Sequence, residues 1–352
     1  MLCMILVSCT GQKTGKENDN NDKIAIEVGE IKFPPQDVLQ LKSYYLSSSV
    51  HVDSIDYLIG YNYRLHSLDC MNLKSKSVTQ IVLPGDGPDA IVRLSGIYAQ
   101  SLDSVWISDE SERAFLIDSV GTIKRMIDLK KYLEDQEQLL INTNYAMFTS
   151  HLFYNASRHS LMFLVKHTPS NTFIVKEVFI DEVGKMATYQ LSSSKVVPDM
   201  SKGYAYINFP NVNFVGENIV YNYPVESSIY MLDIRTNERK YILADSHYTS
   251  NIIEKCTTSG DYATLEKHWL ENSHFYDIMY LPKYKIYARL HADKVDFDEK
   301  KGMEKLINER DLYLMLFDEN MEKIGETKLS NCRYSPFTSW NATYGGIALF
   351  VD

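Results

Sequence analysis

The chain has 352 residues, of which 45% are hydrophobic and 23% charged, a balance typical of a globular protein and not of a disordered one. Its 36 Lys and Arg residues are outnumbered by 46 Asp and Glu residues, which gives a formal net charge of −10. A nucleic-acid-binding protein needs a basic face to meet the phosphate backbone, so this composition argues against nucleic acid as a partner.

The N-terminus has the pattern of an export signal. A short apolar run ends at Cys9, and residues 10–23 contain no apolar side chain. An apolar stretch followed by a small residue, a cysteine and a polar segment is typical of a secretory signal and its processing site. No Lys or Arg precedes the run, which is short for a complete signal. The alternative interpretation is a frayed N-terminal strand.

The segment Leu6-Val7-Ser8-Cys9 resembles the bacterial lipobox, whose cysteine carries a lipid. The resemblance implies that Cys9 is lipidated and attaches the protein to a membrane. It also implies an outer-membrane lipoprotein of the cell envelope, facing the periplasm or the cell surface. We therefore expect residues 1–9 to be a signal remnant with the lipobox, residues 10–23 a flexible leash, and residues 24–352 a single domain.

A short sequence motif recurs along that domain: two or three apolar residues, an aspartate, a turn and another apolar run. Such a motif is typical of a hairpin, in which the aspartate caps the turn through its side-chain oxygen. The five copies are Ser67-Leu68-Asp69, Leu116-Ile117-Asp118, Phe179-Ile180-Asp181, Met231-Leu232-Asp233 and Leu316-Phe317-Asp318.

The spacing of these copies predicts an all-β propeller. The intervals between successive aspartates are 49, 63, 52 and 85 residues, and a period of roughly 50 residues suits four-stranded blades. Short helix-like insertions at 129–140 and about 251–272, and a charged excursion at 293–310, account for the longer intervals. Five copies give five blades, and a sixth would combine residues 334–352 with the strand at 24–28. We favour six blades, with seven as the alternative.

The stretch from Tyr57 to Leu129 is similar to an uncharacterised lipoprotein family of the Bacteroidetes, a domain of unknown function with a six-bladed β-propeller fold. The matching elements are Tyr57-Leu58-Ile59-Gly60-Tyr61-Asn62, Gly85-Asp86-Gly87-Pro88, Leu94 to Tyr98 and Asp103-Ser104-Val105-Trp106. The resemblance implies a propeller in the cell envelope, and it implies no catalytic residue.

The loop Gly85-Asp86-Gly87-Pro88-Asp89 is the most distinctive short motif. Its glycines allow positive φ angles, and Asp86 and Asp89 could face a cation such as calcium. An ordinary turn between strands needs the same residue types, and we favour that interpretation. We therefore predict no cofactor and no metal site, with calcium as the alternative.

A second candidate is the insertion around Trp269, which would cover one rim of the ring. Ligands of such folds bind where loops from several blades converge. We predict that Asp86, Asp89, Trp269 and His274 lie on one face and bind a ligand, with both aspartates accessible to solvent. For the Trp269 segment the other interpretation, an insertion held in place by an aromatic anchor, is the one we favour.

No catalytic motif is present in the sequence. It contains no His-Glu-x-x-His pair and no Gly-x-Ser-x-Gly elbow, which would mark a metalloprotease or a serine nucleophile. Cys70, Cys256 and Cys332 are isolated, so their spacing does not indicate zinc. We assign no catalytic residue.

Two hypotheses of function follow. The first is an envelope-anchored binding or scaffold module for a glycan, a peptide or a protein partner. The second is an envelope enzyme, of the glycan hydrolase, lyase or lactonase type, that uses carboxylates and histidines at the rim. The absence of motifs favours binding over enzyme activity, although the fold by itself does not decide function.

Overall fold

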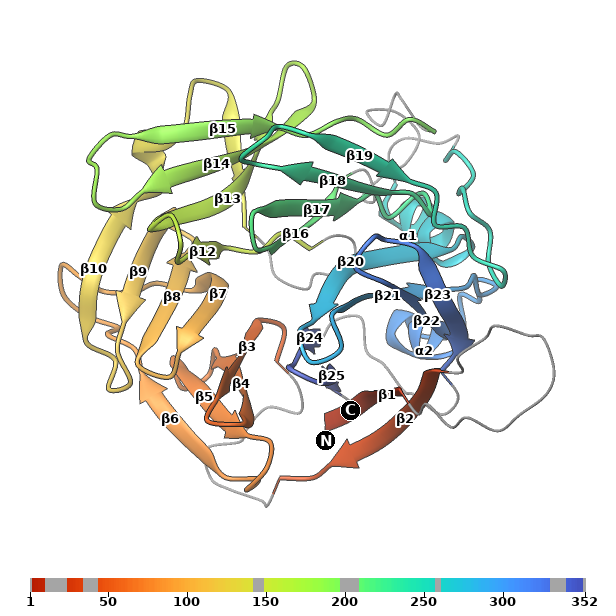
Figure 1. Ribbon diagram of the computed structural model, residues 1–352, viewed down its shortest axis with the longest axis horizontal. Coiled ribbons are helices and arrows are strands. Elements are labelled where there is room, and N and C mark those ends of the chain that lie inside the picture. The colour runs from red at the N-terminus through yellow and green to blue at the C-terminus, as the bar shows by residue number, and fades with distance from the viewer. Residues whose placement is uncertain are drawn as a thin grey trace.

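The computed structural model describes residues 2–9, 24–33, 44–141, 149–196, 209–256, 261–329 and 340–350. These residues form a mainly β propeller, with antiparallel sheets arranged around a central axis (Figure 1). Five blade-like sheets are each built from strands that are consecutive in the chain, and a further sheet combines strands from the two ends of the sequence. The propeller predicted from the repeat is therefore confirmed.

The strands of the five consecutive sheets run in chain order, from the ring axis outward. The first sheet contains β3 (Ser47–Val52), β4 (Ile55–Asn62), β5 (Ser67–Asn72) and β6 (Val78–Val82). The second contains β7 (Leu94–Ser101), β8 (Ser104–Asp109), β9 (Arg113–Ile117) and β10 (Ile123–Asp128). The third contains β11 (Glu137–Leu140), β12 (Phe153–Asn155), β13 (Ser160–His167), β14 (Thr172–Phe179) and β15 (Met186–Gln190).

The fourth and fifth sheets follow the same plan. The fourth contains β16 (Asn211–Val215), β17 (Asn218–Asn222), β18 (Ile229–Asp233) and β19 (Arg239–Ile242). The fifth contains β20 (His274–Leu281), β21 (Ile286–Ala292), β22 (Leu312–Phe317) and β23 (Lys323–Lys328). Alternating strand directions place every connection from an outermost strand to the next innermost strand at one end of the ring axis.

The terminal sheet joins the two chain ends, in the order β2 (Ile24–Ile31), β1 (Leu2–Cys9), β25 (Gly346–Phe350) and β24 (Trp340–Ala342). Both ends therefore lie in one sheet, as the sequence predicts. The C-terminal strand β25 pairs with β1, however, and not with the strand predicted at 24–28. That strand is part of β2 and pairs with the other edge of β1. The innermost strand β24 contacts β3 on one side and β20 on the other, so this sheet closes the ring.

The insertions contain short helices. A 3₁₀ helix spans Leu129–Tyr132, α1 spans Tyr262–Leu270 and α2 spans Met303–Asn308. The side chain of Asp261 caps α1 by accepting the Thr264 N–H at 2.8 Å, as is usual for Asp at a helix start. Within the described residues, no helix has the length and apolar character needed to cross a membrane.

The recurring aspartates mostly cap the turn into the outermost strand. Asp118, Asp233 and Asp318 each accept two backbone N–H groups of the turn that follows. Two of the predicted caps differ: Asp69 lies inside β5 and is fully buried, and the Asp181 carboxylate pairs with Arg125. Asn72 makes the equivalent turn bonds in the first sheet.

Apolar side chains between neighbouring sheets form the core. Between the first two sheets, Ile59, Leu68 and Ile107 are fully buried and belong to one cluster. Similar clusters fill the other spaces between sheets. This packing leaves the space around the axis to the innermost strands, where the site described below is found.

Candidate functional site

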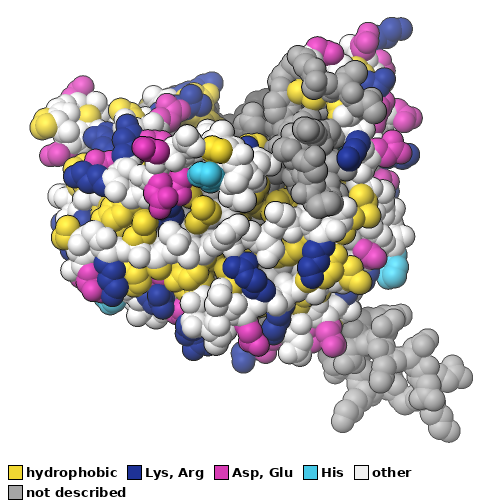
Figure 2. Space-filling view, turned by 90° about the horizontal axis from the view of Figure 1, so that it is seen from above, with side chains coloured by type: hydrophobic (Ala, Val, Ile, Leu, Met, Phe, Trp, Pro, Cys, Tyr) yellow, Lys and Arg dark blue, Asp and Glu magenta, His cyan; other side chains and the backbone are white. Residues whose placement is uncertain are grey.

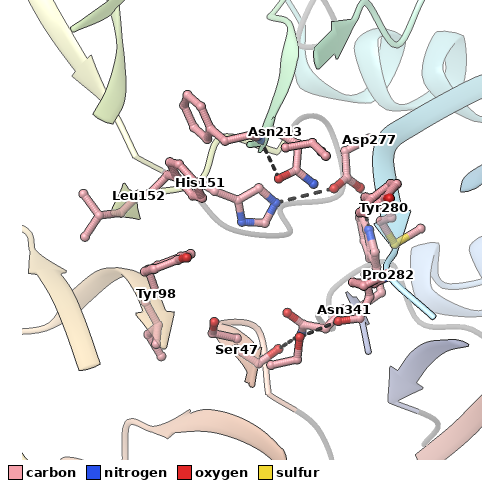
Figure 3. Close-up of a pocket in the computed structure, with 18 of the residues that line it drawn as sticks. Ser47, Tyr98, His151, Leu152, Asn213, Asp277, Tyr280, Pro282 and Asn341 are labelled. Atoms are coloured by element: carbon pink, nitrogen blue, oxygen red, sulfur yellow. Dashed lines mark hydrogen bonds and ion pairs between the residues drawn. The ribbon is translucent and has the colours of Figure 1, made fainter. Parts of the chain in front are cut away.

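A cavity of about 390 Å³ lies where the innermost strands converge (Figure 3). Each of the sheets contributes to its wall through β3, β7, β12, β16, β20 or β24, or through residues adjoining them. Its polar side chains are Ser47, Ser48, Ser49, Tyr98, His151, Asn213, Asp277, Tyr280 and Asn341. Convergence of polar groups from several elements in one concave space is typical of a ligand site.

A β-bulge directs Asp277 toward this cavity. The register between β20 and β21 shifts between Phe275 and Ile278, so Tyr276 and Asp277 together oppose one residue, Leu290. Such bulges re-aim a side chain and are common beside functional sites. The Asp277 carboxylate is only 2% exposed. The indole Nε1–H of Trp340 donates to its Oδ1 at 2.6 Å, which fixes its orientation.

His151 faces Asp277 across the cavity (Figure 3). Its Nε2 lies 3.4 Å from Asp277 Oδ2, and 18% of its side chain is exposed. The innermost strand of the third sheet is interrupted, since β11 and β12 both pair with β13 but are separated in sequence. His151 lies within this interruption, shortly before β12. Thr149, just before it, is held against β16, since its carbonyl accepts the Val212 N–H at 2.7 Å.

Other polar groups of the wall bind across the junctions between sheets. The Asn213 side-chain amide donates to the Ile278 carbonyl at 3.0 Å, which links β16 to β20. The Asn341 amide donates to the Ser47 hydroxyl, which links β24 to β3. Each of these side chains keeps further hydrogen-bonding capacity beyond the bond described. The same groups can therefore hold the ring together and contact a ligand.

Aromatic rings supply the rest of the wall. Phe153 stacks on Phe214 with ring centroids 4.9 Å apart, and Tyr98 meets Phe153 edge-on at 5.1 Å. Burial raises the pKa of the Tyr98 phenol, and nearby Tyr154 adds to this effect. Burial also raises the pKa of Tyr280. Both phenols are therefore neutral at physiological pH and can donate or accept a hydrogen bond.

The charge of the wall limits its chemistry. Among the described residues that line the cavity there is no Lys or Arg, and Asp277 carries the only carboxylate. Glycoside hydrolysis usually needs two carboxyl groups flanking the bond, and this wall provides one. Throughout the described part of the chain, no three His, Cys, Asp or Glu side chains converge as metal ligands would.

The residues predicted from sequence lie elsewhere. Asp86 and Asp89 are exposed on the connection between β6 and β7. Trp269 lies in the connection between β19 and β20, and His274 begins β20. The β6–β7 and β19–β20 connections each run from an outermost strand to the next innermost strand, so they reach the same end of the ring axis. None of these four residues lines the cavity.

Trp269 and His274 are core side chains, with exposed fractions of 3% and 0%. The Trp269 indole N–H donates to His274 Nδ1 at 3.1 Å, and the Arg310 guanidinium lies 5.4 Å from the Trp269 ring. Burial, and then the positive charge of Arg310, hold the pKa of His274 well below its usual range. The segment is thus anchored by an aromatic side chain, which is the interpretation of this insertion that the sequence favours.

The sequence-based search missed His151 and Asp277. His151 is one of nine scattered histidines, and nothing in its local sequence marks it. Asp277 lies within the apolar run of β20, Phe275 to Leu281, and a carboxylate at an otherwise buried strand position was the one available signal. Such a residue is rarely buried without a partner.

A model of a family described as a domain of unknown function, DUF4221, matches residues 17–328. The chain belongs to the DUF4221 family. The crystal structure of a DUF4221 member from Bacteroides vulgatus is similar with a TM-score of 0.66 and 14% identity, over 84% of each chain. A Bacteroides fragilis protein whose name presumes export is similar with a TM-score of 0.50 and 13% identity, over 85% of this chain and 74% of that one. These similarities support the fold.

No protein with curated annotation matches the chain. The family assignment agrees with the resemblance found in the first 130 residues, and it extends that resemblance along most of the sequence. The family is described without a function, so the cavity is the feature from which a ligand can be inferred.

Proposed function

We propose that this DUF4221 protein is a binding module of the cell envelope that holds one sugar unit of a glycan in the central cavity. The observation that carries the proposal is the composition of the wall, which combines hydroxyl, amide and imidazole groups from different sheets with aromatic rings. Hydroxyl-rich rings need many directional hydrogen bonds and an apolar surface for their C–H faces. The cavity volume lies within the range of small-molecule sites.

Calorimetric titration with glucose, galactose, mannose and N-acetylglucosamine tests this proposal. We expect at least one of them to bind, and Tyr98→Ala to weaken that binding about tenfold through the loss of stacking area and a hydroxyl group. Tyr63→Ala is the matched control, because Tyr63 is exposed and does not line the cavity. Absence of binding by all four sugars, or equal effects of the two variants, would overturn the proposal.

The proposed location depends on Cys9. We propose that Cys9 carries the lipid that attaches the protein to the outer membrane. The apolar run that ends there supports this, as does the presumed export of the Bacteroides fragilis protein. Cys9→Ser should abolish incorporation of a fatty-acid probe in cells, whereas Cys256→Ser should not. Labelling that persists in Cys9→Ser would contradict the tether.

Cleavage before Cys9 would remove nearly all of β1, which occupies Leu2–Cys9 between β2 and β25. We propose that the terminal sheet is the sixth blade of the propeller, and that in a processed chain β2 takes the place of β1 beside β25. Deleting residues 24–33 from the processed chain should then lower the melting temperature far more than deleting residues 10–20. Equal melting temperatures for the two truncations would contradict this arrangement.

The contact between His151 and Asp277 favours a second candidate function, an enzyme that hydrolyses an ester or lactone. With Nε2 directed at Asp277, His151 could accept a proton from water through Nδ1 as the water oxygen adds to the carbonyl carbon, and return it to the departing alcohol. Hydrolysis of p-nitrophenyl acetate that is lost in His151→Gln, and kept in His159→Gln, would support this candidate. His159 is exposed and lies outside the cavity.

A further inference from the structure

The Asp277 carboxylate has no permanently charged partner among the described residues that line the cavity. In the described part of the chain, no Lys or Arg lies within ion-pair distance of Asp277, and its one ionisable neighbour is His151, which compensates the charge only when it is protonated. Trp340 donates a hydrogen bond but carries no charge. With the imidazole uncharged, the described lining of the cavity therefore holds one net negative charge.

A buried carboxylate is costly unless a positive group balances it. Some core carboxylates elsewhere in this protein have such a group, whereas Asp69 and Glu226 accept hydrogen bonds from neutral donors deep in the core. Glu177, fully buried, accepts from the Arg158 guanidinium at 2.7 Å, and Glu137 is paired with the buried Lys176 ammonium. Asp277 is equally buried, and among the described residues it has no equivalent cation. Unlike Asp69 and Glu226, Asp277 lies in the wall of a cavity, where a ligand can supply a positive charge.

The surrounding rings favour the same kind of ligand. Tyr98, Phe153, Phe214, Tyr280 and Trp340 line the cavity, and their ring faces carry partial negative charge. A cation is stabilised by such faces, the more so when water is excluded. An anionic ligand would meet both the carboxylate and these faces, and the described lining residues include no Lys or Arg to offset them.

We propose that the ligand is an amino sugar with a free ammonium group, which lies beside Asp277 while the sugar ring fills the rest of the cavity. This inference rests on the proposed function and adds the charge of the ligand to it. An ammonium ion supplies the positive charge that the wall lacks, and its three N–H donors match carboxylate and phenol oxygens.

Protonated His151 competes with that ammonium, because either one balances the same carboxylate. The titratable side chains that share the wall with His151 are Asp277 and Tyr280 of β20 and Tyr98 of β7. Both tyrosines stay neutral in the range where histidine ordinarily titrates. Affinity for the amino sugar should therefore fall under conditions acidic enough to protonate His151.

The test compares glucosamine with glucose, which differ at one ring position. We expect wild-type protein at about pH 7 to bind glucosamine about tenfold more tightly than glucose. Asp277→Asn should remove this preference, because Asn keeps an oxygen that accepts the Trp340 N–H but carries no charge. Asp86→Asn is the matched control, since Asp86 is exposed and outside the cavity. Melting temperatures of both variants verify folding.

Equal affinity of the wild-type protein for the two sugars, or a preference that survives in Asp277→Asn, would overturn the inference and leave the sugar-binding proposal intact. Failure of both sugars to bind would also overturn the inference, and failure of galactose, mannose and N-acetylglucosamine as well would count against the proposed function itself. Ethanolamine, which has the ammonium group without the ring, should bind more weakly than glucosamine, and equal binding would contradict an amino sugar. His151→Gln should remove the pH dependence, and a pH dependence unchanged in this variant would contradict the competition.

Discussion

Glu326 joins the fourth and fifth sheets, and its charge should dominate the acid stability of the propeller. It lies on β23 with a side chain that is 2% exposed. Its oxygens accept the Ser246 hydroxyl at 2.6 Å and the His247 N–H at 3.0 Å, both in the segment after β19. His291 Nε2 lies 3.1 Å away and Lys323 Nζ 3.2 Å away.

These contacts determine the ionisation of Glu326. Burial alone would raise its pKa, but the bonds from His291, Ser246, His247 and Lys323 outweigh burial and lower the pKa from 4.5 to about 2. One pKa unit corresponds to about 1.4 kcal/mol, so this lowering contributes about 3 kcal/mol of stability. Because the folded-state pKa is depressed, the contribution is complete above about pH 4.5 and is lost as the pH falls toward 2.

We therefore expect Glu326→Gln, which keeps the shape and removes the charge, to lower the free energy of unfolding at pH 7 by about 3 kcal/mol. Urea unfolding followed by tryptophan fluorescence at pH 7, 5 and 3.5 measures the change. The difference between wild type and variant should stay constant from pH 7 to 5 and narrow at pH 3.5. Glu322→Gln, at an exposed position of the preceding turn, should alter stability by less than about 0.5 kcal/mol. A difference that is equally large at pH 3.5, or absent at pH 7, would refute the reasoning.

Three further outcomes are expected. Trp340→Phe should lower the free energy of unfolding by about 2 kcal/mol, because the Asp277 carboxylate loses a charged hydrogen bond; an unchanged urea midpoint would contradict this role. Iodoacetamide should label half-exposed Cys256 in the folded protein and should not label Cys70. Burial, and then the neighbouring Asp69 carboxylate, raise the pKa of the Cys70 thiol to about 12. Peptide mass mapping that finds both cysteines labelled equally would be inconsistent with a buried Cys70 thiol. Gly121→Ala should lower the free energy of unfolding by about 1–3 kcal/mol. The new Cβ would lie 2.2 Å from a backbone oxygen of the neighbouring sheet, at a residue whose φ is +86°. A melting temperature equal to that of wild type would exclude this clash.

The sequence predicts the fold better than it predicts the site, because the repeat is local. A turn that needs side-chain acceptors selects Asp or Asn immediately after a strand, so Asp118, Asp233 and Asp318 mark the correct turns. Asp69 matches the same pattern while serving another purpose, since the Tyr44 hydroxyl donates to it inside the core at 2.6 Å. A three-residue motif cannot distinguish a capping carboxylate from a buried one.

The candidate site depends on features that sequence periodicity does not encode. Asp277 faces the cavity because one extra residue shifts the register of β20, and His151 arrives there because its strand is interrupted. Their side chains meet only after the third and fifth sheets are placed around the axis. The face seen in Figure 2 offers no stronger clue, since acidic, basic and apolar side chains are interspersed over it.

The terminal sheet pairs Leu2 with Phe350, at opposite ends of the sequence. Contacts so distant along the chain form slowly, since closing a long loop costs entropy that nearby contacts do not. Each of the five consecutive sheets can assemble as soon as its own residues emerge during synthesis, but β24 and β25 emerge last. The flanks of the first and fifth sheets that β24 covers in the finished ring therefore stay open until then, and an unclosed ring is prone to aggregate through such surfaces.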